Sequence, residues 1–202
     1  MIYERCCTTV EQVQDAMASG LDRAELCYDL PCGGVTPDES TICGAVLTGL
    51  PVNVLVRPRA GGFIYDAAEA GQMMESIEMC ARCGAAGVVI GALTPRGSVD
   101  MPLMTRLVGA ARSHSLSVTF HRAFDECCDP ESVLEQVISL GCDRLLTSGC
   151  APSAWEGREM LARLASQAAG RIIIMPGAGV TRELAGALAD YCGLTEFHGT
   201  RL

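Results

Sequence analysis

Residues 23–28 read RAELCY, a stretch whose alternating polarity predicts a β-strand with two chemically different faces. Side chains along a strand alternate with a period of two residues, so Ala24, Leu26 and Tyr28 share one face. The other face carries Glu25 and Cys27. Because the apolar face is expected to pack against helices, the two polar side chains are left to point toward the opposite side of the sheet.

Seven further short strand-like runs alternate with longer helical patterns along the chain. The predicted strands span residues 2–6, 23–28, 52–58, 87–93, 117–124, 144–148, 171–175 and 194–198. The predicted helices span residues 10–19, 38–47, 67–83, 101–113, 131–140, 154–168 and 182–189. Cap residues support several helix starts, Thr9 and Asp100 among them.

Eight strands separated by helices form either a doubly wound sheet or a closed barrel. The turn after the first strand lacks the G-x-G-x-x-G pattern of the doubly wound dinucleotide-binding fold. Strand count and even spacing therefore favour an α/β protein of the (β/α)8 TIM-barrel type, with a single domain over residues 1–202. The sequence stops at Leu202, so we expect the closing helix after the eighth strand to be short or missing.

The composition excludes several classes of function. The formal net charge is −9, which disfavours binding to nucleic acid. All 15 basic residues are Arg, so Schiff-base chemistry, covalently held pyridoxal phosphate and a Walker A nucleotide loop are excluded. No apolar run is long enough for a membrane span, and no signal peptide is visible. We therefore expect a cytoplasmic protein whose 12 cysteines are reduced and mostly buried as packing residues.

Strand alternation places several further polar side chains beside Glu25 and Cys27 inside the barrel. The pairs that share the inward face are Glu4 with Cys6, Asn53 with Arg57, Thr119 with His121, and Glu196 with His198. Active sites of such barrels form at the carboxyl ends of the strands. Buried charged groups must form ion pairs or take part in a functional site. Two interpretations stay open, a salt-bridge network that holds the barrel together and a functional cavity.

At these residues the sequence resembles the CutC family of copper homeostasis proteins almost end to end. The matching blocks include RAELCYDLPCGGVTP (23–37), VTFHRAFD (118–125), RIIIMPGAGV (171–180) and EFHGT (196–200). The resemblance implies a TIM-like barrel, a role with cytosolic copper, and copper(I) ligands at Cys6 and Cys27. Two loops depart from the family pattern, because Gly62 and Cys32 stand where acidic residues are usual.

Soft thiolates select copper(I), which agrees with Cys6 and Cys27 as a ligand pair on neighbouring strands about 4.8 Å apart. Two inert buried cysteines are the alternative. Cys32 is a possible third thiolate ligand. The sequence assigns no role to Cys7, Cys127 or Cys128.

The alternative function is an enzyme that performs acid–base chemistry on a small phosphorylated or carboxylated metabolite. The candidate acid–base residues are His121, Glu25, Glu4 and His198. The candidate residues for a small anionic ligand are Arg57, Arg59, Arg122, Asp125, Ser148, Gly177, Gly179, Gly199 and Thr200. In the alternative interpretation, these glycines only permit tight turns, and the arginines form ion pairs with Glu4 and Glu25. We also expect a homodimer, in which a partner covers the flank left by the missing helix.

Overall fold

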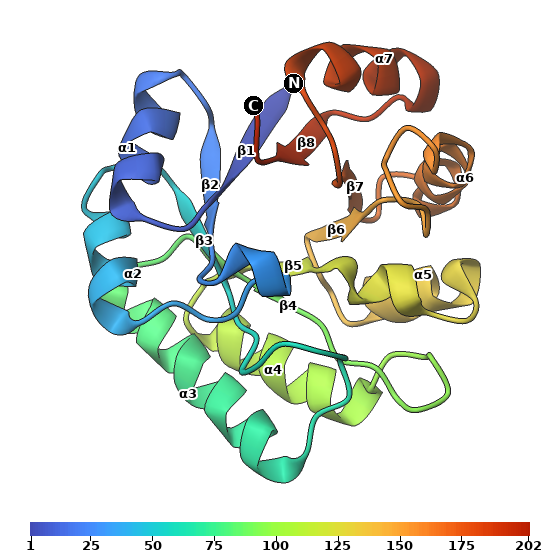
Figure 1. Ribbon diagram of the computed structural model, residues 1–202. Coiled ribbons are helices and arrows are strands. Elements are labelled where there is room, and N and C mark those ends of the chain that lie inside the picture. The colour runs from blue at the N-terminus through green and yellow to red at the C-terminus, as the bar shows by residue number, and fades with distance from the viewer.

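Eight parallel strands form a nearly closed barrel in the computed structural model, which describes residues 1–202 (Figure 1). The strands are β1 (Ile2–Cys7), β2 (Arg23–Leu26), β3 (Val52–Leu55), β4 (Gly87–Ile90), β5 (Ser117–Phe120), β6 (Arg144–Thr147), β7 (Ile173–Pro176) and β8 (Glu196–Gly199). Each strand from β1 to β6 pairs with the next strand in sequence, and β1 also pairs with β8. No ladder joins β7 to β8, so the hydrogen-bonded sheet is open at that one seam. The predicted barrel is confirmed.

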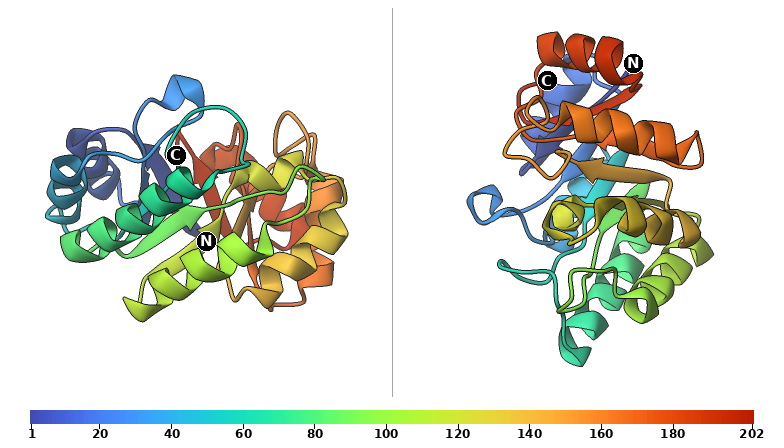
Figure 2. Two further views of the ribbon diagram at one scale, coloured as in Figure 1. Left: turned by 90° about the horizontal axis from the view of Figure 1, so that it is seen from below. Right: turned by 90° about the vertical axis from the view of Figure 1, so that its right-hand side faces the viewer.

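Seven helices surround the barrel, as Figures 1 and 2 show. They are α1 (Val10–Ala18), α2 (Glu39–Val46), α3 (Ala67–Cys83), α4 (Met101–Ser113), α5 (Pro130–Ser139), α6 (Arg158–Ala168) and α7 (Arg182–Cys192). Six of them begin with a side-chain cap, in which an Asp or Thr oxygen accepts a backbone N–H of the first turn. After β8 the chain continues to Leu202 without a further helix. No helix is both long and apolar enough to span a bilayer.

The main apolar core lies between the strands and the helices. It contains 48 buried residues, among them Val54, Val88, Leu145 and Phe197, which face outward from the strands. A separate and much smaller apolar cluster consists of Cys6, Cys27, Leu55 and Val89. Most of the other interior side chains are polar, as the alternation along the strands predicts, but Leu146 lines the interior cavity and Met175 contacts Arg23.

Several predicted strands extend too far at their carboxyl ends. β5 ends at Phe120, whereas the prediction ran to residue 124. Beyond it, Nδ1 of His121 accepts the N–H of Ala123 and begins a 3-10 helix, Arg122–Glu126. A second 3-10 helix, Leu30–Cys32, follows β2. A run of apolar and β-branched residues carries no information about such side-chain caps. Strand propensity alone therefore predicts a strand that is too long.

One disulfide corrects the expectation that the cysteines are all reduced. Cys43 of α2 is bonded to Cys83 of α3, and the two Cα atoms are 4.8 Å apart. Cys43 and Cys83 are therefore not among the reduced packing cysteines that the sequence predicts. Helices α2 and α3 pack side by side, a tertiary contact that the spacing of cysteines in the sequence does not reveal. Cys80 is free and buried.

Candidate functional site

A cavity of about 310 Å³ opens at the carboxyl ends of the strands. Its wall combines side chains from β1, β2, β3, β5, β6 and β8 or their ends with loops that follow the strands. The lining includes Cys6, Glu25, Cys27, Arg57, Phe63, His121, Arg122, Gly179, His198, Gly199 and Thr200. The structure thus brings together most of the site residues predicted from the sequence.

Cys6 and Cys27 lie side by side in this cavity. Their Sγ atoms are 3.7 Å apart, and both residues are buried. In the register of β1 and β2, Cys6 is paired with Glu25. β2 ends at Leu26, so Cys27 projects from just beyond the end of that strand. The hydrogen bond with Cys27, burial and the nearby Glu25 carboxylate all raise the pKa of the Cys6 thiol. Without a metal, Cys6 therefore keeps its proton.

Below the cavity, five polar side chains form a network across the barrel interior. Glu4 accepts hydrogen bonds from Arg23 and from Asn53. Arg23 also donates to Glu196 at 2.8 Å, and Glu196 accepts from Arg144 at 2.7 Å. All five side chains are buried or nearly so. This layer is a salt-bridge network, which is one of the two interpretations of the inward polar side chains, and it forms the floor of the cavity.

His198 connects the floor to the cavity. Its Nδ1 atom lies 2.9 Å from Oε1 of Glu4 and 3.7 Å from Oε2 of Glu25. Burial alone would raise the pKa of Glu4, but the hydrogen bond with His198 and the charge of Arg23 lower it to about 2. Burial lowers the pKa of His198, but the charge of Glu25 and the hydrogen bond with Glu4 raise it overall. His198 therefore favours its cationic form.

Glu25 differs from Glu4 although both carboxyl groups are buried. Burial raises the pKa of Glu25 to about 7, against the opposing charge of His198. Its Oε2 atom has no hydrogen-bond partner in the protein. Two adjacent carboxyl groups thus have well-separated pKa values, an arrangement that acid–base enzymes use.

Arg57 holds two loops over the cavity. Its guanidinium donates to the carbonyl oxygens of Cys32 and Gly34 in one loop and of Gly61 in the other. Only Nε is left without an acceptor. The same guanidinium lies over the ring of Phe63, 5.0 Å from the ring centroid. The guanidinium of Arg57, which the sequence predicts to bind an anion, therefore already donates most of its hydrogen bonds to backbone carbonyls.

His121 also packs against Phe63, with ring centroids 4.9 Å apart. Burial and the charge of Arg57 lower the pKa of His121 to about 3, so the ring is neutral. Its Nε2 atom has no partner. A Cβ atom on Gly91 would come within 2.6 Å of the His121 ring, so the absence of a side chain at this glycine makes room for the imidazole.

Asp125, Ser148 and Arg122 contact one another. Asp125 accepts hydrogen bonds from the backbone N–H groups of Ser148 and Cys150 and from the hydroxyl of Thr147. Arg122 donates to Asp125 at 2.8 Å. Asp125 and Ser148 thus join the loops after β5 and β6, and only Arg122 of the three lines the cavity.

Two other predicted anion-binding residues lie outside the lining. Arg59 pairs with Glu69 at the start of α3 and contacts Tyr65. Gly177 lies against Leu146 and His198, where a Cβ atom would come within 2.7 Å of the Leu146 side chain. Gly179, Gly199 and Thr200 do line the cavity.

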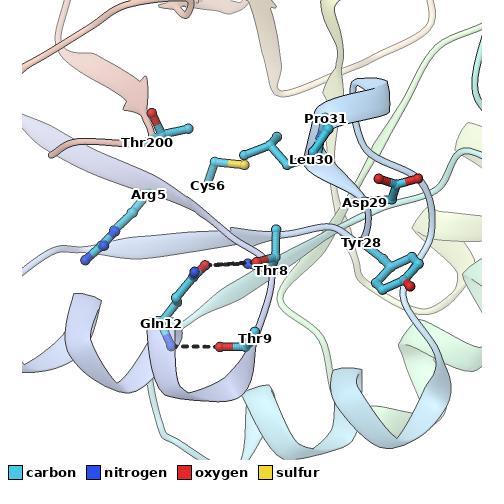
Figure 3. Close-up of a pocket in the computed structure, with 10 residues that line it drawn as sticks. All are labelled: Arg5, Cys6, Thr8, Thr9, Gln12, Tyr28, Asp29, Leu30, Pro31 and Thr200. Carbon is cyan, nitrogen blue, oxygen red and sulfur yellow. Dashed lines mark hydrogen bonds between the residues drawn. The ribbon is translucent and has the colours of Figure 1, made fainter.

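A second, more open pocket of about 360 Å³ adjoins the cavity, between the loop that joins β1 to α1 and the segment that follows β2 (Figure 3). It shares Cys6, Leu30 and Thr200 with the cavity. Figure 3 shows the Cys6 thiol directed toward Leu30, on the short 3-10 helix after β2. The remaining lining is mostly polar and includes Arg5 and Gln12. Cys6 is therefore bordered by two pockets.

The other noted cysteines lie apart from the thiol pair. Cys32 is half-buried, and its thiol donates to the carbonyl of Asp29. Cys7 is buried in the outer core. Cys127 and Cys128 lie in the loop after β5, where the hydrogen bond with Cys150 and burial raise the pKa of Cys127. Neither of these two residues lines the cavity.

Sequence reasoning missed Arg23, Arg144 and Phe63. Arg23 has the same strand parity as Glu25 and Cys27, so alternation was a sufficient signal for its inward position. Arg144 begins β6 and pairs with Glu196 across the barrel. Phe63 comes from the loop between β3 and α3, and no periodicity applies to a loop residue.

Comparisons with protein families and with known proteins identify the same family. The model of the CutC family matches residues 1–202. A CutC family protein from Bacteroides thetaiotaomicron is 46% identical over 198 residues, which cover 97% of this chain and 79% of the relative. One from Pasteurella multocida is 46% identical over 199 residues, which cover 98% of this chain and 81% of the relative.

Solved structures agree with the sequence relatives. The crystal structure of a Streptococcus agalactiae protein, named as a candidate copper homeostasis protein CutC, superposes with a TM-score of 0.93. It is 30% identical, and the match covers 100% of this chain and 99% of that chain. A phosphonomutase-like protein from Burkholderia cenocepacia has a TM-score of 0.70 at 15% identity, over 98% of this chain and 86% of that one. This second likeness concerns the barrel fold alone.

Proposed function

The chain belongs to the CutC family, and from this membership we propose that it is a cytoplasmic copper homeostasis protein that binds copper(I) through Cys6 and Cys27. The observation that carries the proposal is the 3.7 Å separation between the two sulfur atoms in a buried, open-topped site. Thiolates are soft ligands that select copper(I) over hard cations. Buffering and delivery of the ion both agree with a site at the barrel mouth.

The surroundings of the thiol pair suit an anionic copper complex. One copper(I) ion held by two thiolates carries a net negative charge. His198 supplies positive charge nearby, because the charge of Glu25 and the hydrogen bond with Glu4 outweigh burial and raise its pKa. Since the hydrogen bond with Cys27 and burial raise the pKa of Cys6, copper must displace a thiol proton. Copper(I) affinity is therefore expected to rise with pH.

An anaerobic titration of the reduced protein with copper(I), against a competing chelator, tests the proposal. We expect one ion per chain, and a loss of affinity of at least a hundredfold in the Cys6→Ser/Cys27→Ser variant. A Cys80→Ser/Cys142→Ser variant is the matched control, since those two thiols are also free and buried but lie in the outer core. Equal affinity in both double variants would refute the thiol pair as the copper ligands.

A second candidate function is acid–base catalysis on a small phosphorylated or carboxylated metabolite. It is favoured by three buried polar atoms without partners on cavity residues, which are Oε2 of Glu25, Nε of Arg57 and Nε2 of His121. Unsatisfied buried groups of this kind are costly unless a ligand completes them. With its pKa near 7, Glu25 is the better proton-transfer group. His121 stays neutral because its pKa is low, and since its Nδ1 atom accepts the N–H of Ala123, its Nε2 atom carries the ring proton and is a hydrogen-bond donor.

Ligand binding separates the two functions. Inorganic phosphate and oxalate, tested by calorimetry, are expected to bind the wild-type protein and the Cys6→Ser/Cys27→Ser variant equally if the catalytic proposal is correct. The His121→Asn and Arg122→Gln variants are expected to weaken that binding. Absence of binding by any member of a panel of phosphorylated and carboxylated metabolites would remove the enzyme from consideration.

The homodimer expected from the sequence is likewise a proposal. Sedimentation velocity at micromolar concentration tests it, and a monomer would count against it.

A further inference from the structure

Three different donor side chains converge in the cavity. The thiol of Cys6, the carboxyl group of Glu25 and a ring nitrogen of His198 lie within 4.8 Å of one another. Each residue is at most 8% exposed. They come from β1, β2 and β8, which are adjacent in the barrel, so the rigid sheet fixes their separation.

Glu25 provides independent evidence that this cluster binds something. Its Oε2 atom is buried and has no hydrogen-bond partner, and its distance of 3.7 Å from Nδ1 of His198 exceeds a hydrogen bond. A buried carboxylate oxygen in that state normally acquires a partner. Because Glu25 also lines the cavity, a bound ion is able to supply that partner from the cavity side.

The orientation of His198 agrees with metal binding. Its Nδ1 atom lies 2.9 Å from Glu4, and Arg23 and Asn53 hold that carboxylate in turn. Metal-bound histidines in proteins are typically oriented by a carboxylate of this kind, which fixes the plane of the ring. The floor network therefore positions one ligand of the cluster above it.

We propose that Cys6, Glu25 and His198 form a site for a divalent ion of the zinc type, whose binding displaces the proton of the Cys6 thiol and the proton of one His198 ring nitrogen into solvent. Sulfur, nitrogen and oxygen donors together suit zinc, whereas two thiolates suit copper(I). Donor atoms around tetrahedral zinc lie roughly 3.3–3.8 Å apart, so small side-chain rotations close the present set around an ion. Three protein ligands leave one position open toward the cavity, as in catalytic rather than structural zinc sites.

The two metal sites overlap at Cys6. Cys27 is a ligand of copper(I) only, and Glu25 and His198 are ligands of the divalent ion only. Binding of one ion therefore excludes the other. The inference shares Cys6 with the proposed copper(I) site but depends on Glu25 and His198, so each proposal is able to fail alone.

Cobalt(II) is a suitable probe, because a thiolate ligand gives it a charge-transfer absorption band. All measurements use a Cys128→Ser/Cys150→Ser background, which removes two exposed thiols of the mouth loops. We expect one cobalt(II) ion per chain with a thiolate band, displaced by zinc and by one equivalent of copper(I). Cys27→Ser is expected to retain cobalt affinity within about threefold and to lose copper(I).

His198→Gln and Glu25→Gln are expected to weaken cobalt(II) binding at least tenfold each. Glu25→Gln is not expected to weaken copper(I) binding, because it removes a negative charge beside the thiol pair. Circular dichroism checks that each variant is folded, and Glu25→Gln decides the matter if His198→Gln does not fold. Wild-type cobalt affinity in Glu25→Gln would overturn the site. So would failure of the wild-type chain to bind cobalt, or equal loss in Cys27→Ser and Cys6→Ser, which would assign the ion to the thiol pair.

Discussion

Nδ1 of His198 lies 2.9 Å from Oε1 of Glu4, a residue with no exposed surface, directly beneath the cavity. The contact joins the first and eighth strands, and it links the ion-pair floor to the side chains proposed to bind metal. Removal of one partner from a buried pair leaves the other charge uncompensated. The floor is therefore expected to contribute to stability and to the geometry of the site together.

Replacement of Glu4 tests this role. Glu4→Gln is expected to lower the free energy of unfolding by about 3–5 kcal/mol, because Arg23 and His198 lose a buried counter-charge. Urea denaturation at neutral pH measures the change. The control is Glu39→Gln, which breaks an exposed pair with Arg82 and should cost less than about 1 kcal/mol. Equal effects of the two substitutions would contradict the account.

His121 is expected to make stability depend on pH. Burial and the charge of Arg57 lower its folded-state pKa to about 3 from an ordinary value of 6.5, so the unfolded chain takes up a proton first. The contribution of neutral His121 to the free energy of unfolding is complete above pH 6.5, the ordinary pKa of a histidine. It is lost as the pH falls below that value, by up to ~1.4 kcal/mol per pH unit.

His121→Asn is expected to flatten that dependence between about pH 5 and 6.5, since Asn keeps an acceptor for the N–H of Ala123 but does not titrate. Urea midpoints across this range measure the slope, and His114→Asn on the exposed end of α4 is the control. An unchanged slope in His121→Asn would show that the imidazole is protonated in the folded protein.

Two glycine substitutions should have opposite signs. Gly91→Ala would place a Cβ atom within 2.6 Å of the His121 ring, so we expect a loss of about 1–3 kcal/mol. Gly71→Ala lies inside α3 with nothing within 4 Å, and we expect a gain of about 0.5–1 kcal/mol. Thermal unfolding distinguishes them. Tolerance of alanine at residue 91 would mean that His121 has room to move.

The disulfide between Cys43 and Cys83 closes a loop of 40 residues. The chain-entropy model predicts that its loss costs roughly 4 kcal/mol. Dithiothreitol should therefore lower the unfolding midpoint of the wild-type protein but not that of Cys43→Ser/Cys83→Ser. A thiol count on the denatured, unreduced protein should give ten, the number of free cysteines. A count of twelve would contradict the disulfide.

The sequence was informative where periodicity applies. Alternation along β2 placed Glu25 and Cys27 inward, and the same rule brought Glu4, His121 and His198 into one interior. It did not indicate that Arg57 is used by three loop carbonyls, because those carbonyls come from turns with no regular spacing. The disulfide and Phe63 escaped prediction for the same reason, since both depend on tertiary contacts.

X-ray absorption at the copper edge of the copper(I)-loaded protein tests the central claim most directly. We predict two sulfur ligands and no nitrogen or oxygen ligand in the wild-type protein, and loss of this signature in the Cys6→Ser/Cys27→Ser variant. A copper ion bound mainly by nitrogen or oxygen, or a sulfur signature that persists in that variant, would contradict the assignment of Cys6 and Cys27 as its ligands.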